Sequence, residues 1–140
     1  MNLDAMRSEL IRDEAMKLKP YRDSVGKLSI GVGRNLDDVG ISKVEAAQML
    51  DSDIRRTADA LDKAMTWWRG LDEVRQRVLL NMAFNMGVSG LMGFKNTLAA
   101  VRAGKYEDAA AGMLASKWAG QVGDRAQRLA NMMMKGSDHA

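Results

Sequence analysis

Most of the chain carries the hydrophobic pattern of α-helices. Apolar residues recur at spacings of three and four over 3–13, which predicts a short amphipathic helix. The same spacing continues over 43–65, and Ser42 and Glu45 form the Ser-x-x-Glu pattern of a capping box at its start. At ~1.5 Å per residue, this second helix would be roughly 30 Å long. It could link two lobes, although periodicity alone fits one helix of an ordinary bundle equally well.

The second half of the chain predicts four more helices that share a core. Residues 72–86 are apolar on most faces of a helix, so we expect this helix at the centre, ended by Gly87. Shorter helices are predicted over 95–103, 106–116 and 125–134. The residues expected in their core are Leu98, Val101, Ala110, Met113, Leu114, Trp118, Leu129 and Met133.

Between the first two helices, the pattern is that of a short β-hairpin. Gly26 permits a tight turn, and the residues after it alternate large apolar side chains with small ones, as a half-buried strand does. The hairpin would bring Asp23 and Ser29 back towards Glu14 at the end of the first helix. Two carboxyls and a hydroxyl around one cleft can perform general acid and base chemistry on water. The spacing alone also fits a solvated glutamate and a turn-forming aspartate.

Composition narrows the class of protein and excludes several kinds of chemistry. The 140 residues are 46% hydrophobic and 28% charged, which is typical of one globular domain rather than of a disordered chain. No cysteine is present, so disulfides and thiol catalysis are excluded. The single histidine, His139, provides neither a zinc site nor a histidine-assisted nucleophile, and no acidic run has the spacing of a calcium loop. We therefore expect no metal and no cofactor.

The charges and the apolar runs also limit the expected partners. The net charge of +3 is spread along the chain, and no helix-turn-helix, zinc-finger or stacking-aromatic pattern is present, so we expect no nucleic acid. The first 15 residues contain no apolar run of signal-peptide length. No stretch approaches the roughly 18 consecutive apolar residues of a membrane span. We therefore expect a protein that neither exports itself nor inserts stably into a membrane.

One stretch and three later blocks have a specific spacing and order. Glu14 is followed after eight residues by Asp23, and after five more by Ser29 with I-G-V-G-R behind it. The later blocks are N-M-A-F-N-M-G at 81–87, G-F-K-N-T-L at 93–98 and S-K-W-A-G-Q-V-G-D-R-A-Q-R at 116–128. Together they resemble, in the same order, the phage-type lysozymes of the endolysin family. Two positions depart from that family's pattern, because Ser29 stands where threonine is usual and Arg34 where histidine is common.

The resemblance implies a mostly helical α+β fold for the single domain 1–140. A small N-terminal lobe would hold a β-hairpin or short sheet within 14–42, and the helix over 43–65 would link it to a helical C-terminal lobe over 66–140. The helix over 1–13 would pack on the C-terminal lobe. A cleft would lie between the two lobes.

The resemblance also implies a cofactor-free glycoside hydrolase that cuts the β-1,4 bond between N-acetylmuramic acid and N-acetylglucosamine in peptidoglycan. Glu14 would protonate the departing oxygen, while Asp23 and Ser29 hold a water on the opposite face of the sugar. This is the inverting arrangement, in which the carboxyls stand about 6.5–9.5 Å apart. The C-terminal dipole of the first helix and burial would both favour the protonated form of Glu14.

Further residues receive roles only from the alignment with the family. Substrate contacts are implied for Asn35, Phe84, Asn85, Met86 and Thr97. Gly112 stands where a relative has a substrate-contacting side chain, so that contact should be missing here. Arg125 is expected to pair with Glu14 across the cleft, and Arg34 is expected to pair with Asp53. Without the resemblance, Phe84 would be read as a core residue and Arg125 as an exposed residue at the start of a helix.

The resemblance implies a monomer with bacterial peptidoglycan as its partner. It would stay in the host cytoplasm until a separate holin-like protein opens the membrane, and would then reach the periplasm and the cell wall. Two other functions fit the same residues. A non-catalytic wall-binding or virion-associated module would keep the groove without needing Glu14, and a lytic transglycosylase would use Glu14 as both acid and base.

Overall fold

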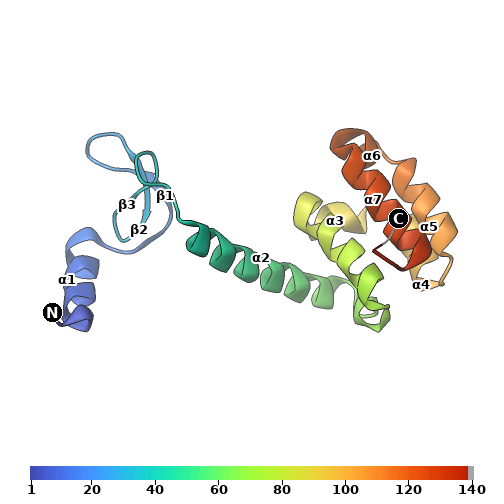
Figure 1. Ribbon diagram of the computed structural model, residues 1–140, viewed down its shortest axis with the longest axis horizontal. Helices are drawn as coiled ribbons and strands as arrows, with labels where there is room; N and C mark the ends of the chain where they lie inside the picture. The colour runs from blue at the N-terminus through green and yellow to red at the C-terminus, as the bar shows by residue number, and fades with distance from the viewer. Residues whose placement is uncertain (139–140) are drawn as a thin grey trace. The chain divides into compact units, whose positions relative to one another are not determined.

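α-Helices dominate the computed structural model, which describes residues 1–138 and also contains one three-stranded antiparallel sheet (Figure 1). The elements are α1 Leu3–Glu14, β1 Lys17–Arg22, β2 Leu28–Gly31, β3 Arg34–Asn35, α2 Lys43–Ala64, the 3-10 turn η1 Trp68–Gly70, α3 Glu73–Met92, α4 Lys95–Arg102, α5 Tyr106–Leu114, α6 Lys117–Val122 and α7 Asp124–Lys135. The predicted mostly helical α+β class is confirmed. His139 lies outside the described residues.

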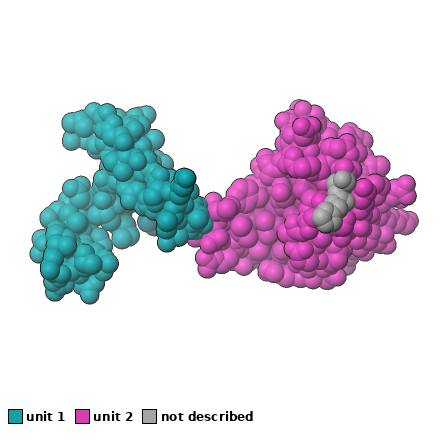
Figure 2. All heavy atoms as spheres, in the orientation of Figure 1, with its two compact units in different colours: residues 1–49 teal, residues 50–140 magenta. Residues whose placement is uncertain are grey.

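The chain divides into two compact units, with residues 1–49 in unit 1 and the residues from 50 onward in unit 2 (Figure 2). The boundary falls inside α2. Two expectations concern contacts between the units, namely the cleft and the packing of the first helix on the helical lobe. Both stay predictions.

Unit 1 consists of α1, the sheet and the first turns of α2. Asn2 caps α1 by accepting a hydrogen bond from the Ala5 N–H at 3.0 Å. The sheet has the order β1-β2-β3, in which Ser29 lies opposite Tyr21 on β1 and Asn35 on β3. Gly26 has a φ of 84° in the turn between β1 and β2, so the predicted hairpin and its turn are confirmed.

The capping box at the start of α2 is also confirmed. Ser42 Oγ accepts from the Glu45 N–H at 3.1 Å, and Glu45 Oε1 accepts from the Ser42 N–H at 2.9 Å. α2 then runs for 22 residues to Ala64, one residue short of the predicted end. Along its whole length, only Leu61 is buried.

The hydrophobic core lies in unit 2, where α3 contributes buried residues together with α4, α5, α6 and α7, and the expected central place of α3 stays a prediction. Its members are Leu61, Met65, Trp68, Val78, Leu79, Met82, Ala83, Leu91, Leu98, Val101, Ala109, Ala110, Met113, Trp118, Ala126, Leu129, Ala130 and Met133. Trp118 satisfies its indole N–H on Asn85 Oδ1 at 2.9 Å. Leu114 was also expected in the core, but it is 42% exposed because α5 ends there and turns this side chain to the surface.

Gly87 interrupts α3 without ending it. Its φ of 81° and ψ of 158° are not helical, yet helical residues continue beyond it to Met92. The sequence correctly predicted a break at this glycine. It missed the short helical segment that follows.

Arg75 joins three helices of unit 2. Its guanidinium stacks on the Tyr106 ring of α5, with 3.4 Å between the guanidinium carbon and the ring centroid. It also donates to the carbonyls of Met133 at 2.6 Å and Met134 at 3.0 Å, near the end of α7. A cation at a helix C-terminus satisfies orphan carbonyls and is favoured by the helix dipole, so Arg75 fastens α7 to α3 and α5. Within residues 1–138, none of the helices has the length and hydropathy needed to cross a bilayer.

The stability of unit 2 should fall when one buried methionine side chain is shortened. Met113 is completely buried, so Met113→Ala should lower the free energy of unfolding by about 2–5 kcal/mol. Met134 is 42% exposed, and Met134→Ala provides the matched control with a change below about 1 kcal/mol. Urea denaturation of both variants measures the difference. Equal losses would contradict this placement of the core.

Candidate active site

The end of α1 meets the turn between β2 and β3 in unit 1. A Cβ atom placed on Gly33 would lie 2.9 Å from Glu14 Oε2, so the carboxylate occupies the space that a side chain at position 33 would need. Ala15 turns the chain out of α1 with φ 62° and ψ 160°, a conformation that costs about 1–3 kcal/mol in a residue other than glycine. Glu14 therefore lies against the turn between β2 and β3, and β2 carries Ser29.

Glu14 is exposed, so the expected burial of its carboxyl is not found. Within unit 1, no cation pairs with Glu14, and its carboxylate occupies the space beside Gly33. The expected contact with Arg125 would join the two units and stays a prediction.

Asp23 and Ser29 are held together through the peptide groups of Lys27. Asp23 Oδ1 accepts from the N–H groups of Val25 at 3.0 Å and Lys27 at 2.8 Å, while the Asp23 N–H donates to the Lys27 carbonyl at 2.9 Å. Ser29 Oγ donates to the same carbonyl at 3.4 Å. These bonds fix one oxygen of Asp23, and its Oδ2 atom accepts no hydrogen bond within unit 1. The structure thus brings Asp23 and Ser29 together, as the hairpin predicted.

Ser29 is only 2% exposed, which limits what its hydroxyl can do. The proton points to the Lys27 carbonyl, so the oxygen has lone pairs left to accept a hydrogen bond from water. The Ser29 hydroxyl therefore has acceptor capacity left and has already used its one proton. Lys27 was not singled out in the sequence, because its contribution is made by its backbone and carries no side-chain signal.

Arg34 binds Glu45 instead of Asp53, so the expected pair was wrong in its partner. Arg34 Nη1 lies 2.9 Å from Glu45 Oε1, Nη2 lies 2.7 Å from Oε2, and Nη1 also donates to the Gly40 carbonyl at 3.1 Å. Asp53 pairs with Arg56 on the same helix. The physical reason is that the capping box turns the Glu45 carboxylate back towards the chain that precedes α2. The alignment with the family could not show this.

This pairing has a clear electrostatic effect. The hydrogen bonds from the Arg34 side chain and from Ser42 lower the pKa of Glu45 to about 2. The Glu45 carboxylate in turn raises the pKa of Arg34. Both partners are therefore charged over the whole range in which proteins normally work.

Asn35 uses its side chain within its own loop. Its Nδ2 donates to Asp38 Oδ2 at 2.9 Å, and its Oδ1 accepts from the Asp38 N–H at 3.0 Å. Asp38 also accepts from Lys27 Nζ at 3.0 Å. Asn35 is therefore a turn-forming residue in the structure, and its contact with a sugar stays a prediction.

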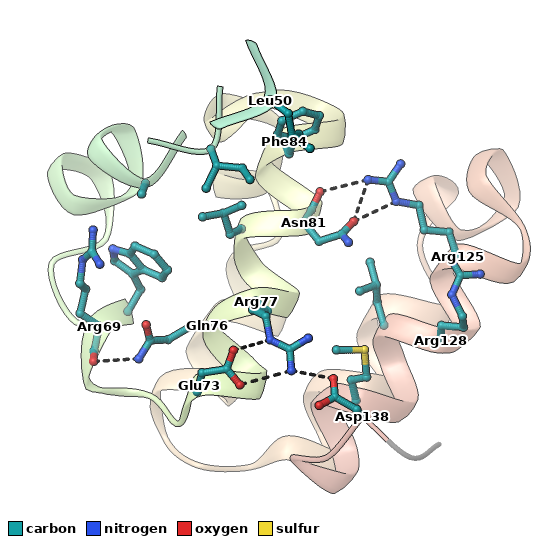
Figure 3. Close-up of a pocket in the computed structure, with 16 residues that line it drawn as sticks. Leu50, Arg69, Glu73, Gln76, Arg77, Asn81, Phe84, Arg125, Arg128 and Asp138 are labelled. Carbon is teal, nitrogen blue, oxygen red and sulfur yellow. Dashed lines mark hydrogen bonds and ion pairs between the residues drawn. The ribbon is translucent and has the colours of Figure 1, made fainter. Parts of the chain in front are cut away.

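Several of the predicted substrate-contacting residues lie in unit 2. Phe84 is 42% exposed and lines a pocket of about 770 Å³ formed by the unit 2 part of α2 together with α3 and α7 (Figure 3). Arg125 lines the same pocket and donates to Asn81 Oδ1 at 2.9 and 2.7 Å. Asn81 therefore fixes the orientation of Arg125, a role that its place in the block 81–87 did not reveal. Met86 is half-buried, and Asn85 is already engaged by Trp118.

Thr97 and Gly112 face each other in a second pocket of about 500 Å³. A Cβ atom on Gly112 would lie 2.5 Å from Thr97 Oγ1, so the threonine occupies the space that a side chain at 112 would need. A side chain at position 112 would therefore clash with Thr97, whose side chain is buried. Within residues 1–138, no group of three or more His, Cys, Asp or Glu side chains could hold a metal ion.

Comparison with known proteins gives a consistent match. Residues 12–133 match the family model described as "Phage lysozyme". The "Probable T4-type lysozyme 1" of Dictyostelium discoideum is 25% identical over 99% of this chain and 98% of its own length. The "SAR-endolysin" of Escherichia phage Mu is 30% identical over 94% of this chain and 81% of its own length. The "Pre-baseplate central spike protein Gp5" of Enterobacteria phage T4 is 30% identical over 95% of this chain, which spans only 28% of that longer protein.

The link between Arg34 and Glu45 should contribute to stability in a pH-dependent way. Because the pKa of Glu45 falls from 4.5 to about 2 on folding, its stabilising effect is fully present above about pH 4.5 and is lost as the pH falls through 2. The melting temperature of Glu45→Gln should thus lie below that of the wild type at pH 5–7, and the two should converge towards pH 2. Glu9→Gln is the control, since Glu9 forms no ion pair among the described residues. A gap that persists at pH 2 would contradict the assignment.

Proposed function

Because this chain belongs to the phage lysozyme family and is a glycoside hydrolase of that family, we propose that it cleaves the β-1,4 bond between N-acetylmuramic acid and N-acetylglucosamine in peptidoglycan. The observation that carries the proposal is the geometry of unit 1. Glu14 lies against Gly33 at one turn of the sheet, while Asp23 and Ser29 share the Lys27 peptide at the other turn. Two carboxyls with different surroundings beside one sheet are what a pair of glycosidase carboxyls requires.

Glu14 is proposed as the general acid. Its carboxylate is held next to backbone that has no side chain in the way, and within unit 1 no cation binds the proton site. Glu14 can therefore carry a proton to the glycosidic oxygen as the bond breaks, which keeps the leaving alcohol neutral.

Asp23 is proposed to act on the attacking water. Its Oδ1 is fixed by two backbone N–H groups, so its Oδ2 has a defined direction in which to accept a proton from water. Ser29 would accept the second hydrogen of that water. A water held in this way attacks from the face opposite the leaving group, which gives inversion at the anomeric carbon. The two carboxyls would then stand about 6.5–9.5 Å apart.

The biological setting is also a proposal. The relatives include proteins named "SAR-endolysin" and "Peptidoglycan hydrolase gp36" from phages, which supports a role in the breakdown of the bacterial wall. We propose that the protein acts during host lysis as a monomer, with bacterial peptidoglycan as its substrate. It would reach the wall from the host cytoplasm after a separate protein has opened the membrane.

A second setting is favoured by one specific observation. The chain spans 28% of the phage T4 spike protein and 15% of the phage phiKMV hydrolase that it matches. Domains of this kind therefore also occur within much longer phage proteins. A role as the wall-cutting domain of a virion would need the same chemistry at Glu14 and Asp23, and a different time of action.

The role of Glu14 is tested by Glu14→Gln. Removing a general acid should reduce the rate by about 10²–10⁴-fold, because the leaving oxygen would no longer receive a proton. Clearing of permeabilised Gram-negative cells measures the rate, and Glu9→Gln on the same helix serves as the matched control. Mass spectrometry of the fragments should show hydrolysed ends, whereas an anhydromuramyl product would identify a transglycosylase. Undiminished clearing by Glu14→Gln would overturn the assignment of the acid.

The close approach of Glu14 to the backbone is tested at two glycines. Gly31 and Gly33 both have positive φ values, of 71° and 69°, so alanine at either should cost about 1 kcal/mol of stability. Only Gly33 has Glu14 within reach of a Cβ, whereas the space at Gly31 is open. Gly33→Ala should therefore lower kcat by at least about 10-fold beyond the effect of Gly31→Ala, because the carboxyl must move. Steady-state kinetics with equal losses in the two variants would contradict this.

A further inference from the structure

The segment next to Gly33 is fastened by a contact that the proposed mechanism does not use. Arg34 follows Gly33 directly and lies opposite Ile30 on β2, one residue from Ser29. β3 is only two residues long, so its ladder alone is a weak means of fixing this backbone. The position of Gly33 therefore depends on what holds Arg34.

Arg34 is held by three acceptors from two other segments. Its two terminal nitrogens bind the two oxygens of Glu45 at 2.9 and 2.7 Å, and one of them also binds the Gly40 carbonyl at 3.1 Å. A guanidinium that binds a carboxylate through two parallel hydrogen bonds is fixed in direction as well as in distance. The loop before α2 and the first turn of α2 are thereby tied to the strand.

Glu45 is itself fixed at both ends. Its backbone N–H and its Oε1 atom form the capping box with Ser42. The carboxylate that receives Arg34 is therefore not a mobile surface group, although it belongs to an exposed turn. The start of α2 thus holds Glu45, Glu45 holds Arg34, and Arg34 is joined directly to Gly33, beside which the Glu14 carboxylate lies.

We propose that Arg34 and Glu45 are positioning residues for the general acid, an inference that rests on the proposed function. The pair fixes Gly33, and Gly33 fixes the place of the Glu14 carboxylate. Neither residue needs to contact the sugar. Loss of the two-pronged contact should therefore misplace the acid in the transition state and leave substrate binding unchanged.

The experiment compares a substitution that keeps the positive charge at position 34 with one that keeps the side-chain shape at position 45. Arg34→Lys retains the positive charge but cannot form two parallel hydrogen bonds with the carboxylate. Glu45→Gln retains the shape of the side chain but loses its negative charge. Both should lower kcat by about 10- to 100-fold with KM changed less than about 2-fold, since a small misplacement of a catalytic group has effects of this size. The exchanged pair Arg34→Glu with Glu45→Arg should recover part of kcat. The matched control is Arg7→Lys in the exposed pair with Asp4, which should leave kcat unchanged.

Unfolding has to be separated from misplacement. Thermal unfolding of each variant sets the temperature at which all are folded, and kinetics on purified peptidoglycan are measured there. An unchanged kcat for Arg34→Lys and Glu45→Gln, with reduced stability, would overturn the proposal and leave the pair a purely structural one. An increase in KM as large as the decrease in kcat would overturn it as well, by indicating direct substrate contact. Failure of the proposed function itself would appear separately, as undiminished activity of Glu14→Gln.

Discussion

The close approach of the Glu14 carboxylate to the backbone at Gly33 is the constraint on which the geometry of unit 1 depends. It requires a residue with no Cβ and with a positive φ, and glycine meets both conditions at once. It also requires the chain to leave α1 sharply, which Ala15 does at some cost in backbone strain. The strain is maintained because the sheet and the start of α2 hold both sides of the contact. Backbone geometry leaves the space that the Glu14 carboxylate occupies, and no side-chain partner within unit 1 sets its position.

The carboxylates of Glu14 and Asp23 in unit 1 are held in different ways. Asp23 has one oxygen fixed by two backbone N–H groups, which orients its carboxylate. Glu14 receives no such donors within unit 1. The same small sheet therefore has one carboxyl with donors and one without beside it.

The sequence predicted the local elements well and the long-range partners poorly, for physical reasons. The capping box at Ser42 and the turn at Gly26 depend on contacts between residues a few positions apart, so their patterns are visible in the chain. The hairpin that joins Asp23 and Ser29 follows from the same local rules. The partner of Arg34 was misassigned because the expectation came from the alignment with the family, which does not show that the capping box turns the Glu45 carboxylate towards Arg34. The part played by Lys27 could not be predicted, since any residue but proline offers the same backbone groups.

The core of unit 2 relies unusually on thioether side chains, which matters for chemistry as well as for packing. Met65, Met82, Met113 and Met133 are at most 2% exposed, whereas Met16, Met49 and Met134 are between 42% and 56% exposed. Oxidation to the sulfoxide turns a pliable apolar group into a polar one that a packed interior cannot accommodate. An oxidant would reach the outer sulfurs first and the inner ones only during transient opening of the helices.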